Sequence, residues 1–200
     1  MTTAVEIDVE VNVPPDGTRM TLEEFLSLPD APRAELEDGV FEMVPPAGGP
    51  HGSVNTRLAI RLGAYVLERG LGEVYDSSTA FVLRTGPRPL VRSPDVSFVR
   101  RGKDDPATAP GSVPLAPDLA VETLSPSDRA GKVQRKIEEY FEHGTTLVWL
   151  IDPQHRTAAV YTRDGSVRWL HEGDALDGGD VIPGFSVPLA FLFAGLAPPR

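Results

Sequence analysis

The chain has 200 residues, of which 40% are hydrophobic and 24% are charged, the composition of an ordinary globular domain. It contains no cysteine, which excludes disulfide scaffolds, thiolate metal sites and cysteine nucleophiles and leaves oxygen or imidazole as ligands for any metal. The formal net charge of -10 argues against a protein that coats nucleic acid through a broad basic surface, although it allows a local basic groove.

Neither a membrane span nor an export signal is expected. No apolar run approaches the roughly 18 residues that a bilayer requires. The first 15 residues lack the basic start and the continuous apolar middle of a signal peptide. We therefore predict a cytoplasmic protein without a membrane partner.

The amino-terminal part predicts a strand and a short helix. Apolar and polar residues alternate from Val5 to Val13, which predicts an edge strand, and residues 1–19 form an amino-terminal arm in this interpretation. Thr21 is followed three residues later by Glu24, the pattern of a capping box that begins a helix.

A hairpin, a long helix and several strands follow. Asp38-Gly39 lies between two alternating segments within residues 34–44 and predicts a tight turn. Apolar residues at helical spacing predict a helix over residues 53–69, which Gly70 closes. A loop rich in proline and glycine is expected over residues 100–117. The strands expected before this loop are 73–76, 80–84 and 91–99.

The carboxyl-terminal half predicts a βαβ unit. A charged amphipathic helix over residues 127–143 lies between two apolar strands, which implies parallel pairing through a right-handed crossover. A hairpin at Asp164-Gly165 follows, and the apolar segment 187–196 is a short helix or a strand. The chain therefore predicts an α/β fold, a mixed β-sheet flanked by helices, in one domain over residues 20–196. The two apolar strands are 118–124 and 146–151.

Two acidic residues lie beside or within apolar strands. Glu122 is flanked by apolar residues, where an unpaired charge is costly, so it needs a metal or a lysine as a partner. Asp95 stands at the start of an apolar run. Two carboxylates on neighbouring strand ends would form a site for Mg²⁺, which prefers oxygen ligands and retains several waters.

The helix after Glu122 carries lysines on one face. Lys132, Lys136 and Tyr140 are spaced by four residues, so their side chains share a helix face that could point back over the strand. In phosphodiester hydrolysis a metal polarises the phosphate and activates water, while a lysine orients that water or stabilises the developing charge. A structural ion pair between Glu122 and Lys136 explains the same residues equally well.

A set of short segments along the chain forms a recognisable pattern: Met20 to Phe25, Glu35 to Gly39, His51, Pro94 to Val99, Ala116 to Ser127, Tyr140 and Val148 to Pro153. These segments resemble the Uma-type restriction endonuclease family of the PD-(D/E)xK nuclease superfamily, and their order and spacing are similar from Met20 to Gly165. The resemblance implies a restriction-endonuclease-like fold and Mg²⁺-dependent hydrolysis of DNA, with Mn²⁺ as an alternative cation.

The resemblance also implies roles for individual residues. Asp95 and Glu122 correspond to the acidic metal ligands of the family, and Glu35 matches a glutamate that assists them. The general nuclease pattern places a lysine two residues after the second acid, but Leu124 stands there. In this family the lysine lies on the helix, four residues before a tyrosine, which matches Lys136.

Further residues are expected to support these. Lys132 is a second candidate for the lysine, Tyr140 follows the family pattern, and His51 would contact a phosphate or cap the long helix. Arg57 and Arg61 share a helix face that could meet a DNA backbone or simply face solvent. Because cutting both strands requires two sites, the resemblance also implies a homodimer.

Two other functions stay open at this point. A catalytically inactive module with the same fold could bind nucleic acid or protein, in which case Asp95, Glu122 and Lys136 have no need to converge. A glycosidase could use Glu35 and Glu122 as acid and base, but it would need an aromatic-lined cleft, and only 7% of the residues are aromatic.

Overall fold

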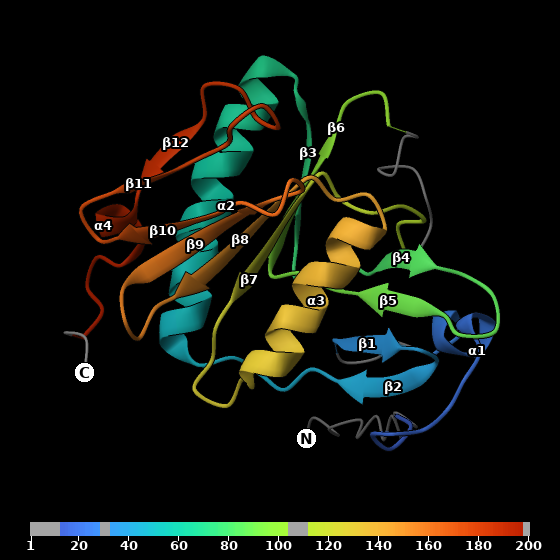
Figure 1. Cartoon of the computed structure of the whole chain (residues 1–200). Helices are drawn as coiled ribbons and strands as arrows, with labels where there is room; N and C mark the ends of the chain where they lie inside the picture. The colour runs from blue at the N-terminus through green and yellow to red at the C-terminus, as the bar shows by residue number, and fades with distance from the viewer. Residues whose placement is uncertain (1–12, 29–32, 104–111, 198–200) are drawn as a thin grey trace, which may run out of the picture.

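The computed structural model describes residues 13–28, 33–103 and 112–197. Two main sheets, a two-stranded sheet and four helices are formed within these residues (Figure 1). The strand predicted from Val5 to Val13 lies outside the described residues except for its last position. At the end of the predicted arm, Arg19 forms an isolated antiparallel bridge with Val40.

The larger sheet has six strands in the order β10-β9-β8-β7-β6-β3. β7 and β8 pair in parallel, as the predicted βαβ unit requires, and the other neighbours are antiparallel. The hairpin between β9 and β10 also forms as predicted, around Asp164-Gly165. The strands are β3 (Gly72–Asp76), β6 (Val96–Arg100), β7 (Leu119–Thr123), β8 (Leu147–Asp152), β9 (Thr157–Thr162) and β10 (Val167–His171).

The smaller sheet has four antiparallel strands in the order β2-β1-β5-β4. Asp38 and Gly39 both have positive φ, 53° and 78°, which is the backbone that a tight two-residue hairpin needs. The predicted turn is thus confirmed, and it joins β1 to β2. The strands are β1 (Ala34–Glu37), β2 (Val40–Met43), β4 (Phe81–Arg84) and β5 (Leu90–Arg92).

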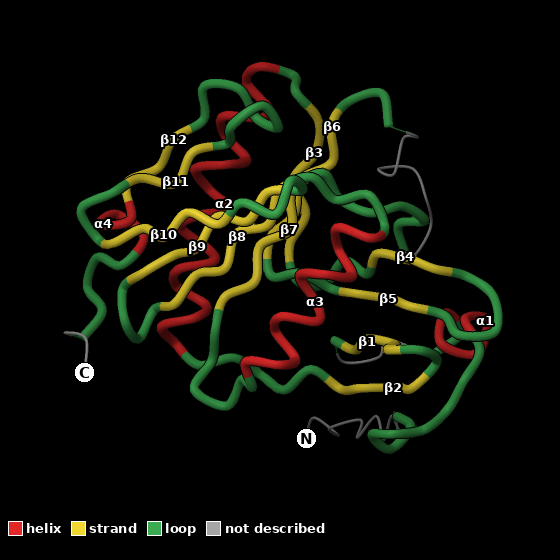
Figure 2. The backbone as a smooth tube through the Cα atoms, viewed as in Figure 1, coloured by secondary structure: helices red, strands yellow, loops and turns green. Residues whose placement is uncertain are grey.

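Two helices cover opposite faces of the six-stranded sheet. α2 (Gly49–Arg69) buries its apolar stripe against β6 to β9. α3 (Ala130–Glu142) buries Ile137 and Tyr140 against the other face of β7 and β8. Figures 1 and 2 show α3 lying between the six-stranded and the four-stranded sheets. Residues of β7 alternate between these faces, so Glu122 belongs to the face that α3 covers.

The ends of the helices agree in part with those predicted from the sequence. α1 (Leu22–Leu26) begins with the predicted capping box between Thr21 and Glu24. α2 begins at Gly49, four residues before the predicted start, and ends at Gly70 with φ 60° as predicted. Every helix within the described residues is too short or too polar to cross a bilayer.

The single strand predicted over residues 91–99 is wrong. The chain leaves the four-stranded sheet after β5, and β6 then begins in the six-stranded sheet at Val96. Pro94 separates them because it has no backbone N–H to donate to a ladder. The change of sheet places Asp95 where the two sheets meet.

The apolar carboxyl-terminal segment contains both of the structures that its pattern allowed. β12 (Ser186–Pro188) pairs with β11 (Ala175–Asp177), a strand that the sequence pattern did not predict. α4 (Leu189–Leu192) follows at once and packs on α2.

Candidate active site

Asp95 and Glu122 lie opposite each other at one end of the β6–β7 pair. The antiparallel register pairs Val96 with Val121, so the next positions along the two strands are Asp95 and Glu122. The Asp95 N–H donates to the carbonyl of Val121 at 2.9 Å, which continues the pairing past the end of β6. The two acidic residues predicted on neighbouring strand ends therefore face each other across the strand pair, with the Asp95 carboxylate bonded to His51 of α2 and the Glu122 carboxylate to Tyr140 of α3.

Two side chains of α3 contact the Glu122 carboxylate. The Tyr140 hydroxyl donates to Glu122 Oε1 at 2.7 Å, and Lys136 Nζ lies 3.5 Å from Glu122 Oε2. Burial raises the pKa of Glu122 above its usual value, and the nearby charges of Asp95 and Glu35 add to this against the opposing effect of Lys136. Two of the three residues of the predicted helix face, Lys136 and Tyr140, thus reach the same carboxylate.

Lys136 connects Glu122 to Glu35. Its Nζ lies 2.9 Å from Glu35 Oε1, and its side chain is only 15% exposed. Burial alone would lower the pKa of Lys136, but the carboxylates of Glu122 and Glu35 outweigh it and raise that pKa above its usual value. Lys136 therefore stays protonated between two acids.

Glu35 is more strongly paired than Glu122. Besides Lys136, it accepts hydrogen bonds from Arg92 at 2.9 Å and from the Ser93 N–H at 3.1 Å. Burial would raise the pKa of Glu35, but Lys136 and Arg92 lower it to about 2. A glycosidase acid needs a raised pKa, so this carboxyl is unsuited to that role.

Lys132 lines the same small cavity as Glu122 and Lys136, but its ion pair is with another acid. Its ammonium pairs with Glu42 at the end of β2, and its side chain is 48% exposed. Of the two candidate lysines, only Lys136 contacts the acidic residues of the site.

Asp95 is buried and accepts three hydrogen bonds or ion pairs. Arg33 contacts Oδ1 at 2.8 Å, while His51 Nε2 at 3.1 Å and the Thr123 N–H at 2.8 Å contact Oδ2. Burial raises the pKa of Asp95, but the hydrogen bond from His51 and the charge of Arg33 outweigh it, so the pKa is lowered. Asp95 is therefore ionised in the folded protein.

A side-chain network orients His51. The Thr123 hydroxyl donates to Asn55 Oδ1 at 2.6 Å, so the Asn55 amide nitrogen faces His51 Nδ1 at 3.1 Å. That assignment makes Nδ1 an acceptor and leaves the proton on Nε2, directed at Asp95. His51 lies within α2 and makes no cap there, since the N-cap is Gly48 without a side-chain bond. The predicted helix-cap role is wrong, and His51 contacts Asp95 instead.

Sequence reasoning missed three residues of the site: Arg33 and Arg92, which pair with its acids, and Asn55, which contacts His51. Arg33 and Arg92 are far from their partners in sequence or separated from them by a change of sheet, so no local spacing marks them. Asn55 lies four residues after His51 on α2, and this helical spacing is a signal that could have identified it.

The arginines predicted to meet DNA or solvent have structural contacts. Arg57 donates to the Leu192 carbonyl at 2.8 Å, and the Arg61 guanidinium lies 5.5 Å from the centre of the Phe191 ring. Both therefore attach α4 to α2.

The donor set fits a magnesium-type cation. Within the described ranges no group of three or more His, Cys, Asp or Glu side chains is arranged to hold a metal. Mg²⁺ is commonly held by one or two carboxylates and keeps several waters, so Asp95 and Glu122 offer donors of the type that it prefers. An ionised carboxylate has about four acceptor positions, and Asp95 uses three of them.

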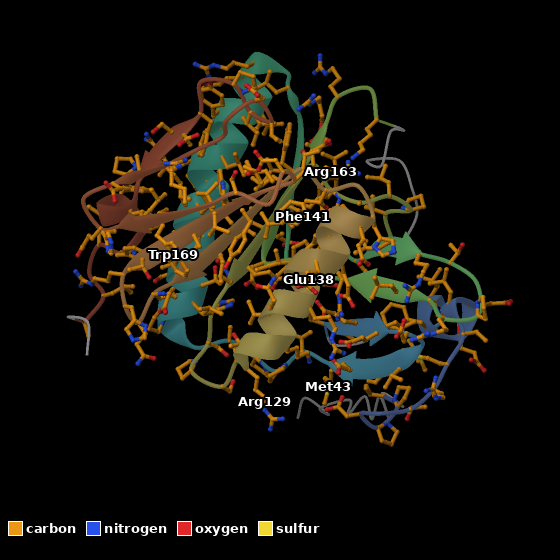
Figure 3. All side chains as sticks on the ribbon, viewed as in Figure 1. Met43, Arg129, Glu138, Phe141, Arg163 and Trp169 are labelled. Carbon is orange, nitrogen blue, oxygen red and sulfur yellow. The ribbon has the colours of Figure 1, made fainter. Side chains whose placement is uncertain are left out.

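The two acids open into different hollows. Glu122 lines a cavity of about 120 Å³ together with Glu35 and Lys136. Asp95 lines a groove of about 690 Å³ beside α2. Residues 43–45 line both. Met43, which lines both hollows, is labelled at the end of β2 in Figure 3.

Comparisons with known proteins agree with this architecture. A family model described as "Uma2: Putative restriction endonuclease" matches residues 22–190. A crystal structure described as "a putative nuclease belonging to DUF820 from Anabaena variabilis ATCC 29413" superposes with a TM-score of 0.73 at 23% identity, covering 87% of this chain and 97% of that chain. No curated protein matches the chain with significant similarity. The predicted mixed-sheet α/β fold is confirmed.

Proposed function

Because the chain belongs to the Uma2 family of restriction-endonuclease-like proteins, we propose that it is a Mg²⁺-dependent endonuclease that hydrolyses DNA phosphodiester bonds. The observation that carries the proposal is the position of Asp95 opposite Glu122, with Lys136 Nζ 3.5 Å from Glu122. Two carboxylates and one lysine are the groups that this chemistry requires.

Each residue has a distinct role in this proposal. Asp95 and Glu122 would hold the cation, which when bound would polarise the phosphate and lower the pKa of water. Lys136 stabilises the negative charge that builds on the phosphoryl oxygens, since it is protonated and fixed between two acids. Glu35 holds that ammonium in place, and Tyr140 orients the Glu122 carboxylate.

A catalytically inactive binding module of the same fold is the second candidate. It is favoured by the existing contacts of Asp95, which already satisfy three of its acceptor positions without a cation. Such a module would bind DNA or protein through the same surface without cleaving anything.

Cleavage of plasmid and linear DNA by purified protein with Mg²⁺ or Mn²⁺ separates the two candidates. We expect cleavage by the wild type and a loss of at least about 100-fold in kcat for Glu122→Ala, which removes a ligand of the cation, and for Lys136→Met, which removes the charge that stabilises the phosphoryl oxygens. Glu138→Ala is the matched control, since Glu138 is exposed on α3 and, among the described residues, its side chain accepts a hydrogen bond from Gln134 and contacts none of the site acids.

The nuclease proposal fails if the wild type cleaves no DNA with either cation, or if Glu122→Ala cleaves as well as wild type. Binding of DNA without cleavage, measured by fluorescence anisotropy, would then favour the inactive module.

A further inference from the structure

Arg92 is a fully buried arginine shared by three acidic side chains. Its side chain is 0% exposed, and its guanidinium contacts Glu35 at 2.9 Å, Glu37 at 3.0 Å and Glu139 at 2.5 Å. Glu35 and Glu37 belong to β1, Arg92 ends β5, and Glu139 lies on α3. One side chain therefore attaches the four-stranded sheet to the helix that carries Lys136.

Glu35 is the point where this buried network meets the candidate active site. It accepts from the Ser93 N–H, two residues before Asp95, and it contacts Lys136 Nζ. The segment that bears Asp95 and the helix that bears the lysine are thus both tied to Glu35. Its position and charge depend on Arg92.

Lys136 has two possible partners at unequal distances. Its Nζ lies 2.9 Å from Glu35 and 3.5 Å from Glu122. Without a second cation on Glu35, the ammonium would be drawn wholly to that buried carboxylate, because an unpaired buried charge costs several kcal/mol. Arg92 supplies the second cation.

We propose that Arg92 is a positioning residue: by pairing with Glu35 and Glu139 it fixes α3 against β1 and keeps Lys136 shared with Glu122. Arginine suits this position because its planar fork offers five donors in fixed directions, whereas a lysine ammonium is a single point of charge. The consequence for cleavage rests on the proposed nuclease function. The consequence for the position of Lys136 does not.

Crystal structures and kinetics of Arg92 variants test the proposal. In Arg92→Met we expect the distance from Lys136 Nζ to Glu122 to exceed the roughly 4 Å limit of an ion pair. We expect kcat to fall at least about tenfold with little change in KM, because charge stabilisation is lost in the transition state more than in the bound substrate. Arg92→Lys should lie between wild type and Arg92→Met in both measurements.

Arg135→Met is the matched control. Arg135 also pairs with Glu37, but its side chain is 64% exposed and it does not contact Glu35. This variant loses the same charge from the same network, and we expect its kcat and the Lys136 position to remain those of wild type.

A double variant separates positioning from general damage. If Arg92 acts through Lys136, Arg92→Met should lower kcat no further in a Lys136→Met background. An additional loss in the double variant, or an unmoved Lys136 in Arg92→Met, would overturn the proposal. If Arg92→Met does not fold, Glu139→Gln is added to it to remove one orphaned charge, and the same distance decides the outcome.

The distance measurement also keeps the two proposals apart. If the wild type proves inactive on DNA, the nuclease function fails, yet a displaced Lys136 in the variant still supports the positioning role. If the wild type is active and Lys136 does not move, only the positioning role fails.

Discussion

At the residue scale, Glu35 and Glu122 share one lysine but differ in their ionisation. Glu35 has Arg92 as a second cation and the Ser93 N–H as a donor, and these lower its pKa. For Glu122 burial dominates, because its partners are one lysine and the neutral Tyr140 hydroxyl, so its pKa is raised. Functional sites often separate the pKa values of neighbouring carboxyls in this way, and in the proposed function Glu122 would bind the cation while Glu35 holds Lys136 in place.

Replacement of Glu35 should show this difference in the pH dependence of stability. The folded pKa of about 2 lies below the unfolded value, so ionised Glu35 stabilises the fold above about pH 4.3, and this contribution is lost as the pH falls toward 2. We expect Glu35→Gln to lower the free energy of unfolding by about 3 kcal/mol at pH 7 and by about 1 kcal/mol at pH 3.

Urea unfolding of both proteins at the two pH values gives this measurement. Glu138→Gln serves as the control for an exposed glutamate of the neighbouring helix. An equal penalty at pH 7 and at pH 3 would show that the ionised form of Glu35 is not the form that stabilises the fold.

The sequence predicted the acidic residues of the site better than it predicted the arginines that pair with them. Glu122 stands out because a charged residue interrupts an apolar strand, and this local contrast needs no tertiary information. Arg33 contacts Asp95 across 62 positions and Arg92 contacts Glu139 across 47, so their partners depend on how the two sheets meet. No periodicity encodes such contacts, and they emerge only from the folded arrangement.

At the element scale, the proposed function gives α3 the lysine that the general nuclease pattern places on a strand. Leu124 occupies the usual lysine position, two residues after Glu122, and lies on the same side of the chain. It lines the same small cavity as Glu122 and Lys136. The strand and the helix thus deliver side chains into one space, and a lysine could enter it from either.

Moving the lysine from the helix to the strand tests this equivalence. The Leu124 N–H still donates to the Ile151 carbonyl at 2.8 Å, so the position is fixed by the backbone. We expect Lys136→Met combined with Leu124→Lys to recover at least about tenfold in kcat over Lys136→Met alone, since the charge returns to the same cavity. Leu124→Met in the same background controls for the change of shape and should recover nothing.

The division of the predicted strand 91–99 has a physical cause that the pattern conceals. Both halves are largely apolar and buried, so their residue pattern predicts a single strand. The break lies at Ser93-Pro94-Asp95, where Pro94 cannot donate to a ladder and the Asp95 carboxylate bonds to Arg33, His51 and the Thr123 N–H. Pro94 indicates a break in the strand, but only the folded structure shows that the chain passes to a second sheet there.

At the scale of the whole molecule, the acidic net charge limits how DNA can be bound. The formal charge is -10, and four basic side chains around the candidate site are already paired with carboxylates of the chain. A phosphate that approaches these side chains must compete with those acids. The four residues are Arg33, Arg92, Lys132 and Lys136.

The salt dependence of DNA binding should therefore be shallow. Each phosphate neutralised by a free cation adds about 0.9 to the slope of log affinity against log salt, and cations that stay paired with the protein's own acids release few counterions. For the Glu122→Gln protein and a short labelled duplex, we expect a slope smaller in magnitude than about 3, measured by fluorescence anisotropy between about 50 and 200 mM salt. A slope of about 6 or more would mean that the ion pairs open on binding and that a broad basic surface forms, contrary to the acidic charge of the free protein.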